Sequence, residues 1–278
     1  MMENDHLIDG LDAQIIRNGL TGEVASRLGE LRVEESVSST NDVIKEMRAC
    51  AFEQFVACVA NQQISGRGRN GRNWQSPANA NIYLSLGCYF EVASLNKLSG
   101  LSLACGVSVA RWLEGQGCSA RIKWPNDIMV DGRKLAGLLI ETHISSDKVF
   151  VVIGLGMNVK MPDEVSAKID QPWIDLQQAS ESGELEFTRN ELVSGLLNSI
   201  IESVLTYRSS GFTGFKRDWQ KFDALSGQMV EVSLDGDNLE VRVIGLADDC
   251  SLRVEVAGVE RNLYAGDVKL KMRRNAGY

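Results

Sequence analysis

The stretch ARIKWPNDIMV-DG-RKLAGLLIETHI, residues 120–144, decides the fold. Its two apolar runs are separated only by Asp131 and Gly132, a pair typical of a type I′ turn between antiparallel strands. A third apolar run, KVFVVIGLGMNV at 148–159, follows closely. Because such short connections leave no room for a helical crossover, the three runs predict neighbouring antiparallel strands.

The hairpin brings two charged residues to one face of the sheet. Counting outward from the turn puts Met129 opposite Lys134 and Asp127 opposite Ala136. Strand alternation then makes Asp127 and Lys134 diagonal neighbours, about 7–8 Å apart. A lysine held there can place its ammonium against a phosphate and a carbonyl together, while the aspartate orients it or helps to hold Mg²⁺. The alternative is a surface ion pair, which contributes little.

Apolar runs on both sides of the hairpin extend the pattern to an α+β fold, with helices packed on a central mixed or antiparallel sheet. Further strands are expected at 31–36, 55–60 and 80–90. Helices are expected at 41–55, 95–117, 187–210 and 211–222. Ser39, Thr40 or Asn41 can cap the first of these helices.

The pattern changes after Phe222. Short alternating strands are expected at 226–234, 239–246, 251–257, 260–265 and 267–272. They predict a compact β-barrel of about fifty residues, near the small end for an independent fold. We therefore expect a short leader at 1–30, a main domain at 31–222 and a C-terminal domain at 223–278.

Composition narrows the possible chemistry. The 278 residues carry 29 Lys plus Arg against 37 Asp plus Glu, a formal charge of −8, which argues against broad binding to nucleic acid or anionic membranes. Because the only histidines are His6 and His143, the sequence argues against a histidine-rich metal site and against a Ser-His-Asp triad. The six cysteines form no CxxC pair, so buried free thiols are expected, with a catalytic cysteine as the alternative. Without a secretory signal or a membrane-length apolar run, the sequence predicts a cytoplasmic protein.

The most unusual segment is the loop GRGRNGR at 66–72, which follows Gln63 and precedes Trp74. Its glycines and arginines can bring backbone N–H groups and guanidinium forks to phosphate or carboxylate oxygens. It is not a Walker A loop, because no GxxxxGK[ST] occurs. A solvated basic turn or an RGG-like nucleic-acid contact is the alternative. Its position between two apolar strands of an acidic chain favours a small anionic ligand.

Three other features allow two interpretations each. GLGMN at 154–158 follows a strand, but Val159 breaks the dinucleotide pattern, so a close approach of the strand end to a flat ligand is favoured. Trp173 can stack on a purine ring or belong to the core. The polar run 38–41 can cap a helix or contact a small polar ligand at the helix N-terminus.

Taken together, these motifs resemble the biotin protein ligases. The ordered set is Ser39-Thr40-Asn41, Gln63 with GRGRNGR and Trp74, KWPND at 123–127, RKLAG at 133–137 and GLGMN at 154–158. The resemblance runs from about Leu31 to the C-terminus. It implies a class II synthetase-like biotin/lipoate ligase fold with a small SH3-like C-terminal domain that helps with ATP and carrier contact. The form without a DNA-binding domain is implied, and the related lipoate ligases lack this combination of motifs.

The resemblance also implies a reaction in two halves. Biotin carboxylate attacks the α-phosphate of ATP, and a lysine of a biotin carrier protein, such as that of acetyl-CoA carboxylase, then attacks the mixed anhydride. Charge develops on phosphoryl oxygens and then on an acyl oxygen, which fixed cations suit better than a histidine base. Biotin and ATP are the implied substrates, with Mg²⁺ as the metal.

Residue roles carried over by position follow the same resemblance. The implied catalytic residues are Lys134, Arg67, Arg69 and Asp127, with Asp127 also the implied Mg²⁺ contact. The implied biotin contacts are Ser39, Thr40, Gln63, Gly66, Arg67, Lys134 and Gly137. The implied contacts to ATP or the adenylate are Arg67, Arg69, Trp74, Asn126, Asn158 and Trp173. Asn70 stands where some relatives carry another arginine, which lowers the charge of the loop.

Four further expectations concern behaviour. The loop at 62–75 has no aliphatic anchor before Trp74, which predicts disorder without ligand and closure over the adenylate. The thirty residues before Leu31 are acidic and too few for a winged helix-turn-helix, which predicts no operator binding and no DNA partner. A ligase that is also a repressor, and a lipoate ligase, are the alternatives. No membrane partner is expected, and a homodimer is compatible with the strand edges.

Overall fold

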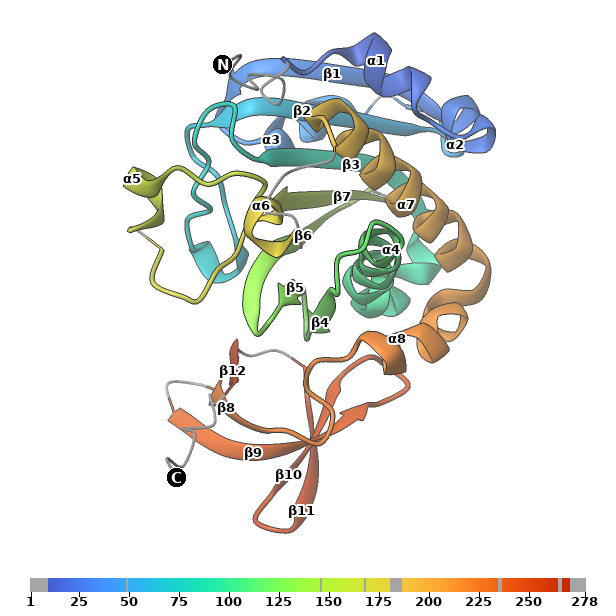
Figure 1. The fold of residues 1–278 in the computed structure, drawn as a ribbon. Coiled ribbons are helices and arrows are strands. Elements are labelled where there is room, and N and C mark those ends of the chain that lie inside the picture. Colours follow the sequence, from blue (N-terminus) through green and yellow to red (C-terminus); the bar gives the residue numbers. More distant parts are fainter. Residues whose placement is uncertain are drawn as a thin grey trace.

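The computed structural model describes residues 10–48, 50–145, 147–167, 169–180, 187–234, 237–264 and 267–270. Within them the chain forms a seven-stranded mixed sheet, with helices on it, and a separate five-stranded antiparallel sheet near the C-terminus (Figure 1). The expected α+β architecture is confirmed, and the smaller sheet is consistent with an SH3-like domain. None of the helices in this described part combines the length and the apolar character needed to cross a membrane.

The larger sheet places the hairpin strands at one end and the N-terminal strand at the other. In spatial order its strands are β1 (Leu28–Val37), β2 (Phe55–Gln63), β3 (Ile82–Glu91), β7 (Lys148–Met157), β6 (Arg133–Ile144), β5 (Asp127–Val130) and β4 (Arg121–Lys123). β1 and β2 run parallel, and all the other neighbours are antiparallel. The three apolar runs that decide the fold are therefore adjacent antiparallel strands, as predicted.

The hairpin turn has the expected geometry, but its register slips. Asp131 and Gly132 have φ values of 50° and 72°, as a type I′ turn requires. Met129 pairs with Lys134 as predicted, whereas Asp127 pairs with Gly137 and not with Ala136. The predicted register is wrong at Asp127 because a bulge between Ile128 and Met129 shifts the pairing by one residue.

Helices cover both faces of the larger sheet. The elements are α1 (Ala13–Asn18), α2 (Gly22–Arg27), α3 (Thr40–Glu46), α4 (Leu101–Gly115), α5 (Asp163–Ser166), α6 (Leu176–Ala179), α7 (Arg189–Ser210) and α8 (Lys216–Phe222). Short 3₁₀ helices lie at Arg69–Gly71, Val92–Gly100 and Gly211–Phe215. The long helices α4 and α7 pack together on one face (Figure 1), while α3 closes a smaller core with Val56, Cys58 and Phe150 on the other.

Three expected helices differ from the structure in their bounds. The helix expected over 41–55 ends at Glu46. The residues after it return the chain to the end of the sheet where β1 begins, because β2 starts there at Phe55 and runs parallel to β1. The second was expected over 95–117, yet its first part is the 3₁₀ helix and α4 begins at Leu101. The last, expected over 211–222, starts as the 3₁₀ helix Gly211–Phe215, and α8 begins only at Lys216. The helix expected at 187–210 is confirmed as α7, which begins at a capping box of Thr188 and Glu191.

The smaller sheet contains all five strands that the sequence predicts. Their order is β11 (Val259–Leu263), β10 (Leu252–Val256), β9 (Asp237–Leu246), β8 (Met229–Leu234) and β12 (Asp267–Leu270). Alternating residues such as Val230, Val241 and Val254 are buried and join the same hydrophobic cluster as the larger sheet. The domain boundary near Phe222–Asp223 stays a prediction.

Candidate functional site

A cavity of about 1070 Å³ lies at the ends of the strands that carry the sequence motifs. Its lining combines residues from α3, the 66–75 loop, the β4–β5 turn, β6, β7 and the 169–173 segment, and it includes Val268 of the smaller sheet. The predicted site residues that line it are Ser39, Thr40, Gln63, Arg67, Arg69, Trp74, Asn126, Asp127, Lys134, Gly137, Asn158 and Trp173. Segments more than a hundred residues apart therefore meet in one cavity.

Gly66 is the exception among the predicted site residues. It is buried behind the cavity wall, and its carbonyl accepts a hydrogen bond of 2.9 Å from the Trp74 N–H. A Cβ atom at this position would lie 2.6 Å from both Ser76 Oγ and the Trp74 carbonyl oxygen. Only glycine therefore fits here, whereas a contact of its backbone with a ligand stays a prediction.

One end of the cavity is a network of uncharged polar groups. The backbone N–H and hydroxyl of Thr40 donate to Gln63 Oε1 at 2.9 and 3.1 Å, and Gln63 Nε2 donates to Ser76 Oγ at 3.1 Å. Ser85 Oγ lies 2.7 Å from Thr40 Oγ1. Ser39 is the N-cap residue of α3, but its side chain makes no capping hydrogen bond. Ser39 and Thr40 line the cavity and the Ser39 side chain does not cap α3, while a contact of these hydroxyls with a ligand stays a prediction.

The arginine loop is fastened to α3 by a bidentate ion pair. Arg67 donates to both carboxylate oxygens of Asp42, at 2.8 and 2.6 Å, and Lys45 donates to the same carboxylate at 3.1 Å. The hydrogen bonds from Arg67 hold the pKa of the Asp42 carboxyl at about 2, well below its usual range. The loop therefore has a charged anchor, which the sequence did not reveal.

This anchor gives a first prediction, for Asp42→Asn. The depressed pKa means that the ion pair stabilises the fold above the ordinary carboxyl pKa near 3.8, and that this contribution is lost as pH falls toward 2. We therefore expect Asp42→Asn to be modestly less stable in urea at pH 6, and the difference to shrink below about pH 4. A stability difference that does not change with pH would mean that the charge of Asp42 is not its source.

The centre of the cavity holds a carboxylate between two ammonium groups. Lys134 Nζ lies 2.7 Å from Asp127 Oδ1, and Lys123 Nζ lies 3.1 Å from Asp127 Oδ2. All three side chains are at most 16% exposed. Burial alone raises the pKa of the Asp127 carboxyl, but the two lysines outweigh burial and the pKa is lower than usual. The predicted Asp127–Lys134 neighbours are thus in direct contact, and Lys123 completes a cluster with one net positive charge.

Trp74 forms part of the cavity floor against the glycines of β6 and β7. A Cβ atom on Gly156 would lie 2.4 Å from the indole Cε2, and Lys134 Nζ lies 5.3 Å from the ring centroid. The sequence predicted that this glycine would let a strand end approach a flat ligand. Instead, the flat group against Gly156 is a tryptophan of the same chain. Gly154, similarly, leaves room for Asn41 Oδ1, which a Cβ atom would approach to 2.4 Å.

The far end of the cavity is built by amide side chains and backbone. Asn126 donates to the Leu138 carbonyl at 2.7 Å and accepts from Arg69 at 3.3 Å. Asn158 is buried and donates to the Ile174 carbonyl at 3.1 Å. Trp173 follows Pro172, whose carbonyl accepts from the Lys134 N–H at 2.9 Å. Trp173 is half-buried at the cavity wall and is not a core residue.

The donor set does not fit a preformed magnesium site at Asp127. Both of its oxygens are engaged by lysines, and no group of three potential metal-binding side chains exists among the residues that the structure describes. A protein site for Mg²⁺ needs free carboxylate oxygens. The contact of Asp127 with a metal stays a prediction.

Several residues of the site were missed from the sequence. Lys123 could have been found, because it stands four residues before Asp127 in KWPND. Asn41 stands in the first motif, but its hydrogen bond of 2.6 Å to Glu141, and that of Lys45 at 2.9 Å to the same carboxylate, join residues about a hundred positions apart. No local pattern reveals such a pair.

Comparisons with known proteins agree with this geometry. Residues 33–158 match the Biotin/lipoate A/B protein ligase family, and residues 225–271 match the Biotin protein ligase C terminal domain. The fold also matches that of the solved biotin protein ligase from Aquifex aeolicus in complex with biotin and ATP, with a TM-score of 0.70 and 25% identity. The match covers 87% of this chain and 98% of the Aquifex chain. The motifs of the cavity fall within the first matched range, except Trp173.

Two curated relatives extend the match along the chain. The Bifunctional ligase/repressor BirA of Escherichia coli is 31% identical over 245 residues, which are 87% of this chain and 74% of that protein. The Biotin--[acetyl-CoA-carboxylase] ligase of Mycobacterium tuberculosis is 31% identical over 278 residues, covering 96% of this chain and 98% of that one. With 31% identity to both relatives, over 74% of the first and 98% of the second, and with the matching fold, this chain belongs to the biotin protein ligase family.

Proposed function

We propose that this chain is an ATP-dependent biotin protein ligase, which makes biotinyl-5′-AMP and transfers the biotinyl group to a lysine of a carrier protein such as that of acetyl-CoA carboxylase. One observation carries the proposal. A single cavity joins an uncharged hydrogen-bonding end at Thr40 and Gln63, a cationic centre at Lys134, and an end with Asn158 and Trp173. This order suits a neutral ring, a reacting carboxylate and phosphate, and a nucleoside.

The first half-reaction is a displacement at phosphorus. A biotin carboxylate oxygen forms a bond to the α-phosphorus of ATP, the bond to the bridging oxygen of the β-phosphate breaks, and pyrophosphate leaves. Negative charge spreads over the phosphoryl oxygens, so cations fixed nearby lower the barrier. We assign this role to Lys134, with Arg67 and Arg69 from the loop. Asp127 would orient the ammonium of Lys134 through the 2.7 Å ion pair.

We assign the ring of biotin to the uncharged end. A ureido group offers two N–H donors and one carbonyl acceptor, and hydroxyls can serve either. Ser39 and Thr40 are nearly fully buried, which makes hydrogen bonds to them strong and selective. Gln63 and the backbone of Gly66 and Gly137 would complete the set. Trp74 would lie beside the reacting carboxylate, since its ring is in contact with Gly156 and near Lys134.

We assign the adenosine to the end formed by Asn126, Asn158 and Trp173. The half-buried indole of Trp173 is available for stacking on a purine. The amides of Asn126 and Asn158 already bond backbone carbonyls, so they would position the wall more than bind the base. Magnesium would accompany the phosphates of ATP.

In the second half-reaction a carrier lysine attacks the acyl carbon. The new bond is an amide, the acyl–oxygen bond to phosphate breaks, and AMP leaves with that oxygen. The attacking amine must lose a proton, and the same fixed cations stabilise the oxyanion of the acyl group. The carrier must reach the cavity from solvent, at the side that the 66–75 loop borders.

Biotin-dependent exchange between ATP and pyrophosphate tests the first half, and transfer to a purified biotin carrier domain tests the second. We expect both activities with biotin. Exchange with lipoate but not with biotin would make the chain a lipoate ligase. Exchange without transfer to any carrier would overturn the assignment of the second half.

The arginine loop gives a second prediction. We expect Arg69→Ala to release biotinyl-5′-AMP about tenfold faster, because a guanidinium that contacts the adenylate makes charge-assisted hydrogen bonds. Rapid filtration of the enzyme–adenylate complex measures this release. Exposed Arg121→Ala, on β4, is the control.

Closure of the same loop over the adenylate is tested by limited proteolysis. Protease nicking of the loop should slow with biotin plus ATP. A loop that is nicked equally with and without ligand would contradict the closure.

The remaining expectations stay proposals. We propose a cytoplasmic location, in keeping with six cysteines that are all unpaired. The repressor activity in the names of some relatives concerns those proteins. That this chain does not bind operator DNA is checked by a gel shift with the promoter of its own biotin genes, and a homodimer by sedimentation.

A further inference from the structure

The turn between β4 and β5, at the cavity wall, also contacts a turn of the smaller sheet. Lys123 and Asp127 pair across the end of the β4–β5 hairpin, and both side chains belong to the ionic cluster. Trp124, between them, is 3% exposed, and its indole N–H donates to the Cys250 carbonyl at 3.1 Å. One turn of three residues therefore joins the ionic cluster to a segment 126 positions away.

Cys250 lies in the turn between β9 and β10, and this turn is packed against the main domain. The Cys250 thiol is buried, and a Cβ atom on Gly100 would lie 2.5 Å from its sulfur. Ser99 Oγ donates to the Asp249 carbonyl at 3.0 Å. The burial of the Cys250 side chain thus depends on this turn being docked between Trp124 and Gly100.

The strand before the Trp124 turn is held from the same side. The Ala224 N–H donates to the Ile122 carbonyl at 2.9 Å, so the edge of β4 that faces away from β5 is bonded to the segment leading into the smaller sheet. Val268 of β12 adds to the cavity wall nearby. The position of Lys123 therefore depends on contacts from beyond residue 222.

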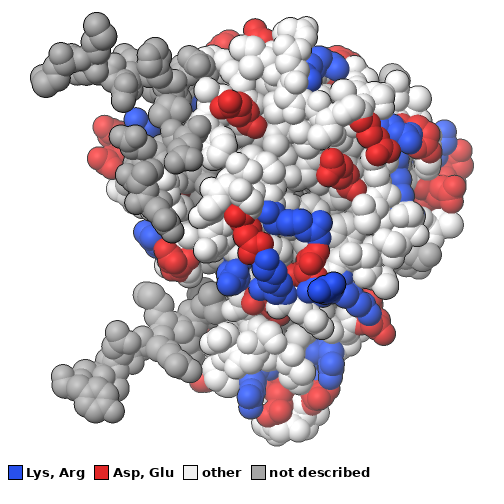
Figure 2. Space-filling model, turned by 45° about the vertical axis from the view of Figure 1, so that its right-hand side comes forward, with Lys and Arg blue, Asp and Glu red and all other residues white. Residues whose placement is uncertain are grey.

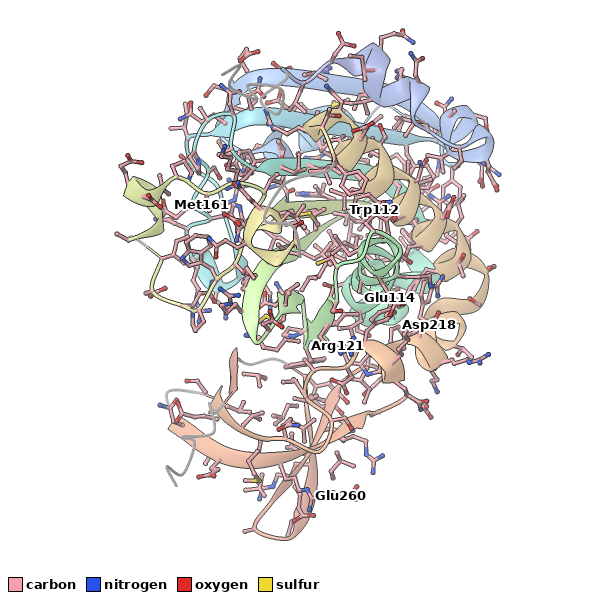
Figure 3. The ribbon with its side chains drawn as sticks, in the orientation of Figure 1. Trp112, Glu114, Arg121, Met161, Asp218 and Glu260 are labelled. Atoms are coloured by element: carbon pink, nitrogen blue, oxygen red, sulfur yellow. The ribbon has the colours of Figure 1, made fainter. Side chains whose placement is uncertain are left out.

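The outer side of this junction is charged and exposed. Figure 2 shows a mixed group of acidic and basic side chains just above the part of the molecule that contains the smaller sheet. Figure 3 places Glu114, Arg121 and Asp218 in this region. Ion pairs here join Arg111 to Asp218 and Lys221 to Glu114. Such exposed pairs contribute little, so the buried contact of Trp124 is the stronger connection.

We infer that Trp124 is a positioning residue, through which the docked smaller sheet holds Lys123 and Asp127, and hence Lys134, in place for the adenylation step. The inference rests on the proposed function. It predicts a division of effects, because Thr40, Gln63 and Ser85 of the uncharged end are held by hydrogen bonds to one another across α3, β2 and β3, and the Trp124 side chain takes no part in these bonds. Loosening Trp124 should slow adenylation and leave the binding of biotin unchanged.

The test is Trp124→Phe, which keeps an aromatic ring but removes the N–H donor. We expect kcat for biotin-dependent ATP–pyrophosphate exchange to fall about tenfold while the KM for biotin changes less than about twofold. Reaction of Cys250 with a thiol reagent, followed by mass spectrometry of its peptide, should become about tenfold faster. Half-exposed Cys50 serves as the internal reference for reagent activity.

Two more variants complete the experiment. Lys216→Met breaks the exposed ion pair of 2.7 Å to Asp248 in the same turn and should change neither readout. Gly100→Ala places a methyl group against the Cys250 thiol from the opposite side, away from the cavity, and should reproduce both effects of Trp124→Phe. It carries the test alone if Trp124→Phe fails to fold.

The outcomes separate this inference from the proposed function. No exchange by the unsubstituted protein would overturn the function. With exchange present, a normal kcat in Trp124→Phe would overturn the inference, and so would a reduced kcat without faster labelling of Cys250, since the residue would then act locally and not through the smaller sheet. A raised KM for biotin in step with the lost kcat would also overturn it.

Discussion

Lys134→Ala is expected to lower kcat/KM for biotin-dependent ATP–pyrophosphate exchange by about 10²-fold or more. The ammonium lies at the junction of the two ends of the cavity, 2.7 Å from Asp127 Oδ1 and above Gly137, where a Cβ atom would be 3.3 Å from it. A fixed cation at the reacting phosphate stabilises charge that develops in the transition state, so its loss appears mainly in kcat. Exchange assays against both substrates measure the effect.

The control for Lys134→Ala is Lys160→Ala, an exposed lysine just beyond β7 that does not line the cavity. It should keep full activity. If Lys134→Ala exchanged pyrophosphate at the normal rate, Lys134 would have only a structural role, in its ion pair with Asp127. Since Lys123 also carries an ammonium on Asp127, the double variant Lys123→Met with Lys134→Ala shows whether the second lysine supplies the residual activity.

The stability of Lys134→Ala will also change, contrary to what the hairpin position suggests. A lysine two residues after a turn is expected to have few contacts, so its removal would barely alter the melting temperature. In the structure its side chain is only 15% exposed, pairs with a buried carboxylate and lies over the Trp74 ring. We expect a loss of about 1–3 kcal/mol, and the assays therefore belong well below the melting temperature of the variant.

The sequence predicted the part of the site that local rules determine. Asp131-Gly132 specifies its turn by backbone conformation, so the proximity of Asp127 and Lys134 followed from strand alternation alone. The bulge that moves Asp127 opposite Gly137 did not follow, because a bulge depends on how β5 and β6 fit their other neighbours. The ion pair forms in spite of the slip because a long lysine side chain can reach either position.

Contacts between distant segments were beyond the sequence. Gly156 was expected to let a flat ligand approach, yet the structure shows the Trp74 indole there. This contact could not be predicted, because it depends on how the 66–75 loop packs over the sheet. Likewise, Asp42 stands next to a recognised motif, but nothing in its neighbourhood indicates a bidentate partner 25 residues later. All the predicted site residues except Gly66 line one cavity, but their partners inside the protein could not be found without the structure.

Asp127→Ala is expected to be the most destabilising substitution in the cavity. It would leave the ammonium groups of Lys123 and Lys134 close together in a site where both side chains are at most 16% exposed, with the shared carboxylate gone. Removing one partner from a buried ion pair costs about 3–5 kcal/mol, because the remaining charge keeps its desolvation penalty. Urea unfolding at pH 7 measures this loss, and adenylation should fall about 10²-fold as Lys134 loses its orientation.

Asp127→Asn separates charge from shape. The two lysines hold the pKa of Asp127 below its usual range despite burial, so the carboxylate stabilises the fold above the unfolded pKa near 3.9, and this contribution is lost as pH falls below it. We therefore expect Asp127→Asn to be less stable than the unsubstituted protein at pH 7, and the difference to narrow below about pH 4.

A double-mutant cycle then shows whether repulsion between the lysines causes the loss. Adding Lys123→Met to Asp127→Asn removes one of the two facing charges, so it should restore about 1 kcal/mol or more of stability, whereas Lys123→Met alone should destabilise. Adenylation should not recover in the double variant, because Lys134 still lacks the carboxylate that orients it. Additive losses of stability would mean that the three side chains do not act as a cluster. Full activity in the double variant would show that Asp127 only neutralises charge and does not position Lys134.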